Sequence, residues 1–261
     1  MTHEPLRITR DNGVLEVVLD RPKANAIDAA TSRTMGELFA GFRDDPSLRV
    51  AIVTGGGQKF FSAGWDLKAA AEGEAPDADF GVGGFAGLQQ LPGLNKPVIA
   101  AVNGMAVGGG FELALACDLI LAAAHATFAL PEIKVGVLAD AATVKLPRRV
   151  PYHVAMDLLL TGRSIDAADA QAWGLVNEVL PAGALMTRAR ELARLLADGP
   201  PLVLAAIKEV VRETATMGEQ EALALVARKG LPTVVRVYGS EDLLEGARAF
   251  AEKRKPVWRG R

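Results

Sequence analysis

Near the middle of the chain, residues 105–118 read MAVGGGFELALACD. Three consecutive glycines before an apolar run predict a backbone packed closely against a neighbour, followed by the first turns of a buried helix. The first N–H groups of a helix have no intrahelical acceptor, so they can bind an anionic oxygen. Glu112 lies three residues after Gly109, on the same side of the first turn. The stretch therefore predicts an oxyanion-binding amide beside an acid/base carboxylate.

Composition limits the class of protein. The 261 residues are 50% hydrophobic and 23% charged, which suits one large domain or a domain with a smaller helical appendage. A net charge of −2 argues against nucleic-acid binding by general electrostatics. Cys117 is the single cysteine and lies in an apolar run, which is typical of a small core residue in a reducing compartment. With neither a signal peptide nor a membrane-spanning run in view, we expect a cytoplasmic protein without a membrane partner.

Strand-like and helix-like runs alternate up to about residue 180. Strands are expected at residues 6–9, 14–19, 49–54, 97–102, 119–123 and 127–130, and helices at 182–197, 202–216, 219–228 and 240–253. Asp28 and Asp66 are placed to cap helices. Residues 71–84 are small, acidic and glycine-rich, which predicts a mobile surface loop. The order of the elements favours the α/β class, with repeated ββα units followed by a helical lid or oligomerisation element.

Several familiar sites are disfavoured. Residues 81–86 fit the dinucleotide fingerprint in form, but they follow the acidic loop rather than a strand. The three histidines are scattered without ligand spacing, so we expect no metal site. No Gly-x-Ser-x-Gly elbow supports a serine hydrolase.

Two turns of small residues remain, at 62–64 and 108–110. Small residues let main-chain amides approach a ligand, and two amides that converge on one oxygen form an oxyanion hole, each donor stabilising the transition state by roughly 3–4 kcal/mol. Glu132 follows Pro131 in apolar sequence. It is equally well interpreted as a rim residue or helix cap and as a second acid/base group.

These segments resemble a known family. Residues 61–67, 96–104 and 108–114 resemble the crotonase (enoyl-CoA hydratase/isomerase) superfamily, and the resemblance extends through 131–132, 160–163, 173–177 and 250–254. It implies a crotonase-like spiral of ββα units over residues 1–195 and a C-terminal helical region over 196–261. It also implies a homotrimer or a dimer of trimers. The substrate would be an acyl-CoA thioester, with coenzyme A entering as part of the substrate and no separate cofactor.

The resemblance also carries residue roles. The amides of Ala63 and Gly109 would hold the thioester oxygen, and Glu112 and Glu132 match the hydratase carboxylate pair. We assign the α-carbon proton to Glu132 and the water to Glu112. Substrate and CoA contacts are expected at Lys23, Ala24, Ala26, Ala63, Gly64, Trp65, Asp66, Leu67, Lys68, Gly108, Gly109 and Lys253. The lysines are candidates for the CoA phosphates or are solvated surface charges. Trp65 either offers an aromatic face to a cationic acyl group or packs under its loop.

One stretch departs from the family pattern. Where hydratases typically carry a glycine pair after the second glutamate, this chain has Ala141, Ala142 and Thr143, and the segment is one residue shorter. Added β-carbons beside a packed site carry an overpacking cost of about 1–3 kcal/mol. We expect them to change the acyl specificity or to weaken hydration.

Three functions are compatible with these residues. The first is hydration or dehydration of a short-chain acyl-CoA, and the second is enoyl-CoA isomerisation. The third is a non-catalytic acyl-CoA or RNA binder, which the pI near 6.0 and the absence of a basic-aromatic stripe disfavour. Two glutamates favour water chemistry, because migration of a double bond needs only one proton shuttle.

Overall fold

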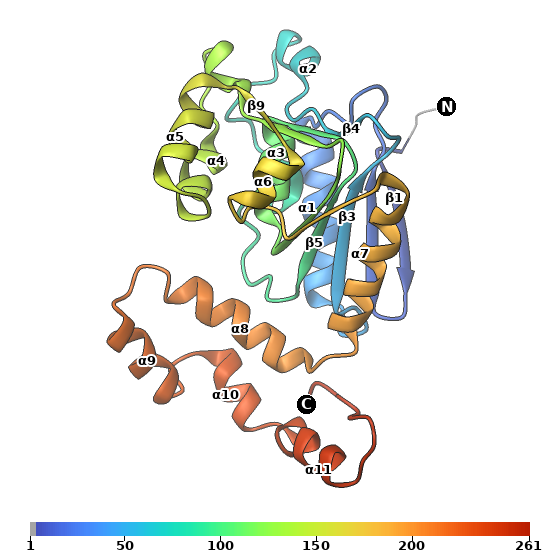
Figure 1. The fold of residues 1–261 in the computed structure, drawn as a ribbon, viewed down its shortest axis with the longest axis vertical. Coiled ribbons are helices and arrows are strands. Elements are labelled where there is room, and N and C mark those ends of the chain that lie inside the picture. Colours follow the sequence, from blue (N-terminus) through green and yellow to red (C-terminus); the bar gives the residue numbers. More distant parts are fainter. Residues whose placement is uncertain (1–3) are drawn as a thin grey trace.

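The computed structural model describes residues 4–261 and contains two sheets (Figure 1). The larger sheet has the order β1-β2-β3-β5-β7-β10, with β1 and β2 antiparallel and the other pairs parallel. Its strands are β1 (Leu6–Asp11), β2 (Val14–Leu19), β3 (Val50–Gly55), β5 (Val98–Val102), β7 (Leu119–Ala123) and β10 (Glu178–Leu180). The smaller sheet consists of β4 (Phe60–Ser62), β6 (Met105–Val107), β8 (Thr127–Ala129) and β9 (Ser164–Asp166).

The ββα units after the first divide their strands between the two sheets. Both strands of β1-β2-α1 belong to the large sheet. In the next units one strand joins the large sheet, the following strand joins the small sheet, and a helix follows, as in β3-β4-α2 and β5-β6-α3. The helices of this part are α1 (Ala29–Asp44), α2 (Leu67–Ala71), α3 (Gly109–Ala116), α4 (Asp140–Lys145), α5 (Tyr152–Thr161), α6 (Ala167–Ala172) and α7 (Ala182–Ala197). This arrangement confirms the expected spiral, and it brings the turns after β4 and β6 together because those strands are neighbours.

The helices α1 and α2 are capped by the two aspartates predicted from the sequence. The Asp28 carboxylate accepts a hydrogen bond of 2.7 Å from the Thr31 amide at the start of α1. Asp66 accepts one of 3.0 Å from the Lys68 amide at the start of α2. Each carboxylate satisfies a helix N–H group that has no acceptor within the helix.

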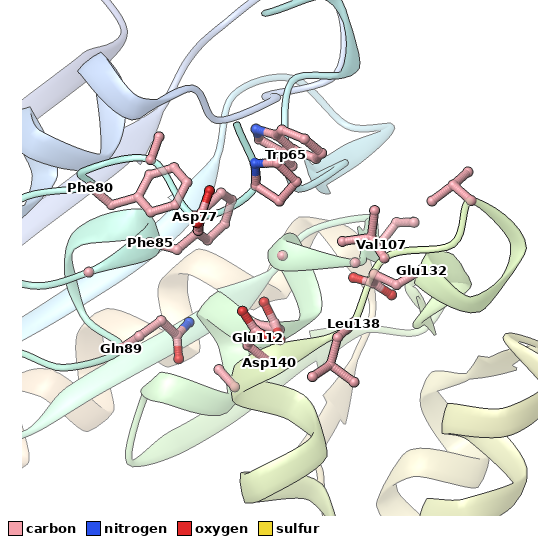
Figure 2. A pocket seen from close by; sticks show the side chains of 18 of the residues that line it. Trp65, Asp77, Phe80, Phe85, Gln89, Val107, Glu112, Glu132, Leu138 and Asp140 are labelled. Carbon is pink, nitrogen blue, oxygen red and sulfur yellow. The ribbon is translucent and has the colours of Figure 1, made fainter. Parts of the chain in front are cut away.

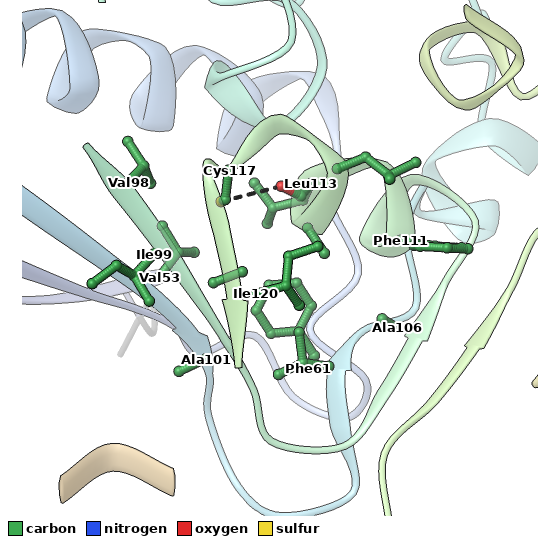
Figure 3. Packing of buried hydrophobic residues seen from close by; sticks show 14 of the residues in the cluster. Val53, Phe61, Val98, Ile99, Ala101, Ala106, Phe111, Leu113, Cys117 and Ile120 are labelled. Atoms are coloured by element: carbon green, nitrogen blue, oxygen red, sulfur yellow. Dashed lines mark hydrogen bonds between the residues drawn. The ribbon is translucent and has the colours of Figure 1, made fainter. Parts of the chain in front are cut away.

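The core fills the space between the large sheet and the helices (Figure 3). β3 and β5 are buried along their whole length, as expected for inner parallel strands. Phe111 of α3 packs against Phe128 of β8 with ring centroids 5.1 Å apart. Cys117 is buried, and its thiol contacts the Leu113 carbonyl. Burial raises the pKa of this thiol to about 12, so it is a core residue rather than a nucleophile.

The C-terminal helices extend away from the sheets (Figure 1). They are α8 (Pro201–Glu213), α9 (Glu219–Ala227), α10 (Pro232–Tyr238) and α11 (Glu245–Ala251). The first three share a small apolar cluster of their own. Arg49 ties this region to the core by donating to the carbonyls of Ala197 and Trp258, both at 2.9 Å. The division of the chain at residues 195 and 196 stays a prediction.

The sequence interpretation missed several short elements. α4, α6 and α10 have six or seven residues, too few for a helical period to stand out. The single helix expected at residues 240–253 is a short 3-10 turn, η4 (Glu241–Leu244), followed by α11. The remaining 3-10 turns are η1 (Phe85–Gly87), η2 (Pro131–Lys134) and η3 (Leu146–Arg148).

Asn25 fastens the segment before α1 to the turn around β4. Its side-chain amide donates to the carbonyls of Gly56 (3.0 Å) and Phe60 (2.9 Å), and its carbonyl accepts from the Arg21 amide. Asn25 is 4% exposed and has a φ of +52°. An asparagine is favoured here because it tolerates the left-handed region and carries both donors and an acceptor.

We predict that Asn25→Ala lowers the free energy of unfolding by roughly 2–4 kcal/mol. The substitution leaves buried carbonyl groups without a donor, and alanine is also less stable than asparagine in the left-handed backbone conformation. Urea denaturation measures the change. Asn12→Ala is the matched control, since Asn12 has a φ of +47° but is exposed, and only about 1 kcal/mol should be lost. Equal losses in the two variants would contradict the role of the buried hydrogen bonds.

Candidate active site

A cavity of about 730 Å³ opens where the turns after β4 and β6 meet (Figure 2). The N-terminus of α3 and the β4–α2 turn form its floor, the segment at residues 76–85 forms one wall, and residues 131–145 form the other. Seven of the predicted site residues line it: Ala63, Trp65, Leu67, Gly108, Gly109, Glu112 and Glu132.

Glycine brings the two turns into contact. Gly64 has a φ of +79°, and a β-carbon there would lie 2.5 Å from the Gly109 amide nitrogen. No other residue type fits this approach without displacing the start of α3. The two junctions predicted from the sequence are therefore one site.

The free amides of this site belong to Trp65 and Gly109. Among residues 4–261, neither N–H group donates to a protein acceptor, and both residues line the cavity. Gly109 is the first residue of α3, where the helix dipole also favours negative charge. Two such donors at one cavity match an oxyanion hole.

This geometry corrects the assignment of Ala63. Its amide donates to the Ala24 carbonyl at 2.9 Å, so it is not available to a thioester oxygen. The segment at residues 24–27 pairs with the chain on both sides of Gly64, since the Ile27 amide donates to the Gly64 carbonyl and the Asp66 amide to the Ile27 carbonyl. The left-handed turn at Gly64 leaves the next amide, that of Trp65, out of this pairing. Sequence spacing alone gave no sign of which amide is free.

Glu112 is held at the floor of the cavity and is 8% exposed. Its Oε1 accepts a hydrogen bond of 2.8 Å from the Ala142 amide in the first turn of α4. Burial raises the pKa of Glu112, while the Ala142 amide lowers it. The carboxylate is therefore oriented by the main chain with its other oxygen left for a ligand or water.

Glu132 lies on η2, directly after β8. A β-carbon at Gly108 would lie 2.8 Å from Glu132 Oε1, so this carboxyl group packs against the backbone next to the Gly109 amide. Its Oε2 is buried and has no hydrogen-bond partner among the described residues. Burial, and then the charge of Glu112, raise the pKa of Glu132 to about 7. A carboxyl group poised near neutrality is suited to proton transfer.

The three residues that replace the family's glycine pair, Ala141, Ala142 and Thr143, differ in where they lie. Ala142 is fully buried in the core, and its amide donates a hydrogen bond to Glu112. Ala141 lines the cavity, and Thr143 is exposed. Only one of the added β-carbons therefore narrows the site.

The remaining predicted contact residues are not part of the cavity lining. Ala24 and Ala26 are half-buried beside the turn, and Asp66 caps α2 and pairs with Arg21 (Nη2–Oδ2 3.3 Å). Lys23, Lys68 and Lys253 are exposed, and Lys253 lies just beyond α11. Their contacts with CoA stay predictions.

The acidic loop has a role that the sequence did not reveal. Residues 76–81, together with Gly84 and Phe85, form a wall of the cavity, although composition alone suggested a mobile surface loop. Phe80 and Phe85 stack edge to face with centroids 5.4 Å apart and face the cavity. Gln89 and Lys145, joined by a hydrogen bond of 2.5 Å, were also missed. The two phenylalanines were the signal that this loop has a buried side.

Other kinds of site find no support in the described part of the chain. Within residues 4–261, no group of three or more His, Cys, Asp and Glu side chains is arranged to hold a metal ion. None of the described helices is long and apolar enough to cross a membrane.

The fold and this site place the chain in a family. The model of the enoyl-CoA hydratase/isomerase family matches residues 9–261, and the chain belongs to that family. Carnitinyl-CoA dehydratase of Citrobacter koseri is 58% identical over 259 residues, which are 99% of each chain, and that of Salmonella arizonae is 58% identical over 258 residues. Among solved structures, enoyl-CoA hydratase of Mycobacterium tuberculosis is similar, with a TM-score of 0.89 and 39% identity over 99% of this chain and 100% of that one.

We predict that the pKa of Glu132 falls in the Glu112→Gln variant, because the neighbouring negative charge is lost while burial is unchanged. NMR of the carboxyl carbons in selectively labelled protein measures it, with wild type titrating near 7. An unchanged pKa would show that the two carboxyl groups do not interact across one cavity.

Proposed function

We propose that this protein catalyses the reversible hydration of a short-chain enoyl-CoA, with crotonobetainyl-CoA and carnitinyl-CoA as its substrate pair. The observation that carries the proposal is the convergence on one cavity of two unpaired amides, the buried carboxyl group of Glu112 and the half-buried one of Glu132. Relatives at 58% identity over nearly the whole chain, named carnitinyl-CoA dehydratase, support the acyl group. The enzyme is a hydro-lyase.

The amides of Trp65 and Gly109 would bind the thioester oxygen. Attack of water at the β-carbon pushes charge onto this oxygen, and fixed donors stabilise that charge more than the neutral ground state. α3 adds its positive N-terminal end to the same point. This is why the glycine-rich turn opens onto the cavity.

The two glutamates divide the proton transfers. In hydration, the Glu112 carboxylate accepts a proton from water as its oxygen bonds to the β-carbon, and protonated Glu132 gives a proton to the α-carbon. In dehydration, Glu132 removes that proton and Glu112 protonates the departing hydroxyl group. The raised pKa of Glu132 fits a group that must be an acid in one direction and a base in the other.

The proposed chemistry uses only these side chains and amides, with coenzyme A arriving as part of the substrate and no separate cofactor. We also propose a cytoplasmic location, which the single, buried and unpaired Cys117 supports.

Assembly as a homotrimer or a dimer of trimers is part of the proposal. The C-terminal helices expose apolar side chains that nothing in the described chain covers, including Val203, Ile207 and Val211 along α8 and Phe250 on α11. The α8 residues recur every four positions and form one stripe. A neighbouring copy is the simplest cover for this region, which holds the predicted oligomerisation element.

The direct test compares hydration of crotonobetainyl-CoA and crotonyl-CoA by loss of the absorbance of the conjugated thioester. We expect a higher kcat/KM for crotonobetainyl-CoA. A preference for crotonyl-CoA would make the protein a general enoyl-CoA hydratase instead.

We predict that Glu112→Gln lowers kcat for hydration by about 10²- to 10⁴-fold, because the amide cannot accept the proton of water. Binding of the unreactive butyryl-CoA, measured by calorimetry, should change little. Asp140→Asn is the matched control, since Asp140 is a carboxylate of the same cavity that is exposed, and its effect should be much smaller. Retained turnover in Glu112→Gln would refute the assigned role.

A further inference from the structure

Glu74 makes two contacts that set it apart from the other acidic residues of its loop. Its Oε1 accepts a hydrogen bond of 2.9 Å from the indole Nε1 of Trp65, and its Oε2 accepts one of 2.9 Å from the Ala29 amide. Glu74 is half-buried, whereas Glu72, Asp77 and Asp79 are exposed. One carboxylate therefore joins the indole ring to the first turn of α1.

These contacts fix the Trp65 ring relative to the core. α1 is anchored by Met35, Phe39 and Phe42, which are fully buried. Hydrogen bonds to a carboxylate are stronger than neutral ones, and the N-terminus of a helix favours the negative charge. The Trp65 ring is thus held as a rigid wall of the cavity, with Glu74 on the side of its N–H edge.

Glu74 acts on the cavity from behind this wall. Trp65 lines the cavity with Phe80 and Phe85 (Figure 2). The Glu74 carboxylate instead accepts hydrogen bonds from Trp65 and Ala29. The hydrogen bond to the indole is therefore the contact that links Glu74 to the cavity lining. The negative charge at the edge of the ring strengthens the attraction of its face for a cation.

The rest of the lining also favours a positively charged acyl group. Asp77, Asp79 and Asp140 line the cavity in addition to the two catalytic glutamates. The two lining lysines are bound to the protein, Lys134 Nζ to the Gly162 carbonyl at 2.9 Å and Lys145 Nζ to Gln89 Oε1 at 2.5 Å. A quaternary ammonium group donates no hydrogen bond, so aromatic faces and nearby negative charge are what recognise it.

We propose that Glu74 is a positioning residue that holds and polarises the Trp65 indole, and that this pair selects acyl-CoA substrates bearing a quaternary ammonium group. The inference rests on the proposed function, because it names the residues that choose the acyl group of that same site. In the proposed function the amide of Trp65 binds the thioester oxygen. The inference requires in addition that the ring of the same residue lies against the acyl chain.

The test uses two saturated thioesters that differ in one atom. Butyrobetainyl-CoA carries the trimethylammonium group, and 5,5-dimethylhexanoyl-CoA replaces its nitrogen with carbon. Calorimetry gives the ratio of their Kd values for the full-length wild type, Glu74→Gln, Trp65→Phe and the double variant. Glu72→Gln is the matched control, because Glu72 is an exposed carboxylate of the same loop.

We expect wild type and Glu72→Gln to bind the cationic thioester more tightly than the neutral one by about five- to tenfold. Glu74→Gln and Trp65→Phe should each reduce this ratio to within about twofold of unity. Affinity for the neutral thioester should be nearly unchanged in Glu74→Gln, whereas the smaller ring of Trp65→Phe lowers the affinity for both thioesters. In the Trp65→Phe background, Glu74→Gln should cause no further loss.

Three results would overturn the inference. The ratio could survive in Glu74→Gln, both thioesters could weaken equally in that variant, or the two substitutions could act additively. The first would show that Glu74 does not set selectivity, the second that it only supports the fold, and the third that it does not act through Trp65. Because binding is measured without turnover, a failure to hydrate crotonobetainyl-CoA would refute the proposed function separately.

Discussion

The site depends on the contact between the turn after β4 and the N-terminus of α3. Gly64 approaches the Gly109 amide so closely that any β-carbon would collide with it. This contact sets the Trp65 and Gly109 amides at one cavity and leaves both without a protein acceptor. The neighbouring strands β4 and β6 supply the two turns, so the parallel pairing of these two strands is what makes the contact possible.

The two carboxyl groups come from different elements, and both face the same cavity. Glu112 comes from α3 and is oriented by an amide of α4, while Glu132 comes from η2 and packs against Gly108. Burial raises the pKa of both, and the charge of one raises that of the other. Desolvation thus raises the pKa of both glutamates above its ordinary value, to about 7 for Glu132, which suits that group to proton transfer near neutral pH.

Much of this arrangement could be predicted from local patterns. Local sequence was sufficient to predict several features: the glycine run before Glu112, the caps Asp28 and Asp66, and the buried strands β3 and β5. The assignment of Ala63 was wrong because hydrogen-bond direction depends on a partner segment far away in the chain, at residues 24–27. The wall formed by the acidic loop was missed for a related reason. Apart from Phe80 and Phe85, its composition is that of a surface loop, and the tertiary contacts of Glu74 and Phe85 show that one side of it is buried.

The most direct test of the account is a crystal structure with a bound saturated acyl-CoA thioester. We expect the thioester oxygen to lie about 2.7–3.1 Å from the main-chain nitrogens of both Trp65 and Gly109. The carboxyl groups of Glu112 and Glu132 should face its α- and β-carbons. An oxygen bound instead by the Ala63 amide, or an acyl chain that lies outside the space between the two glutamates, would contradict it.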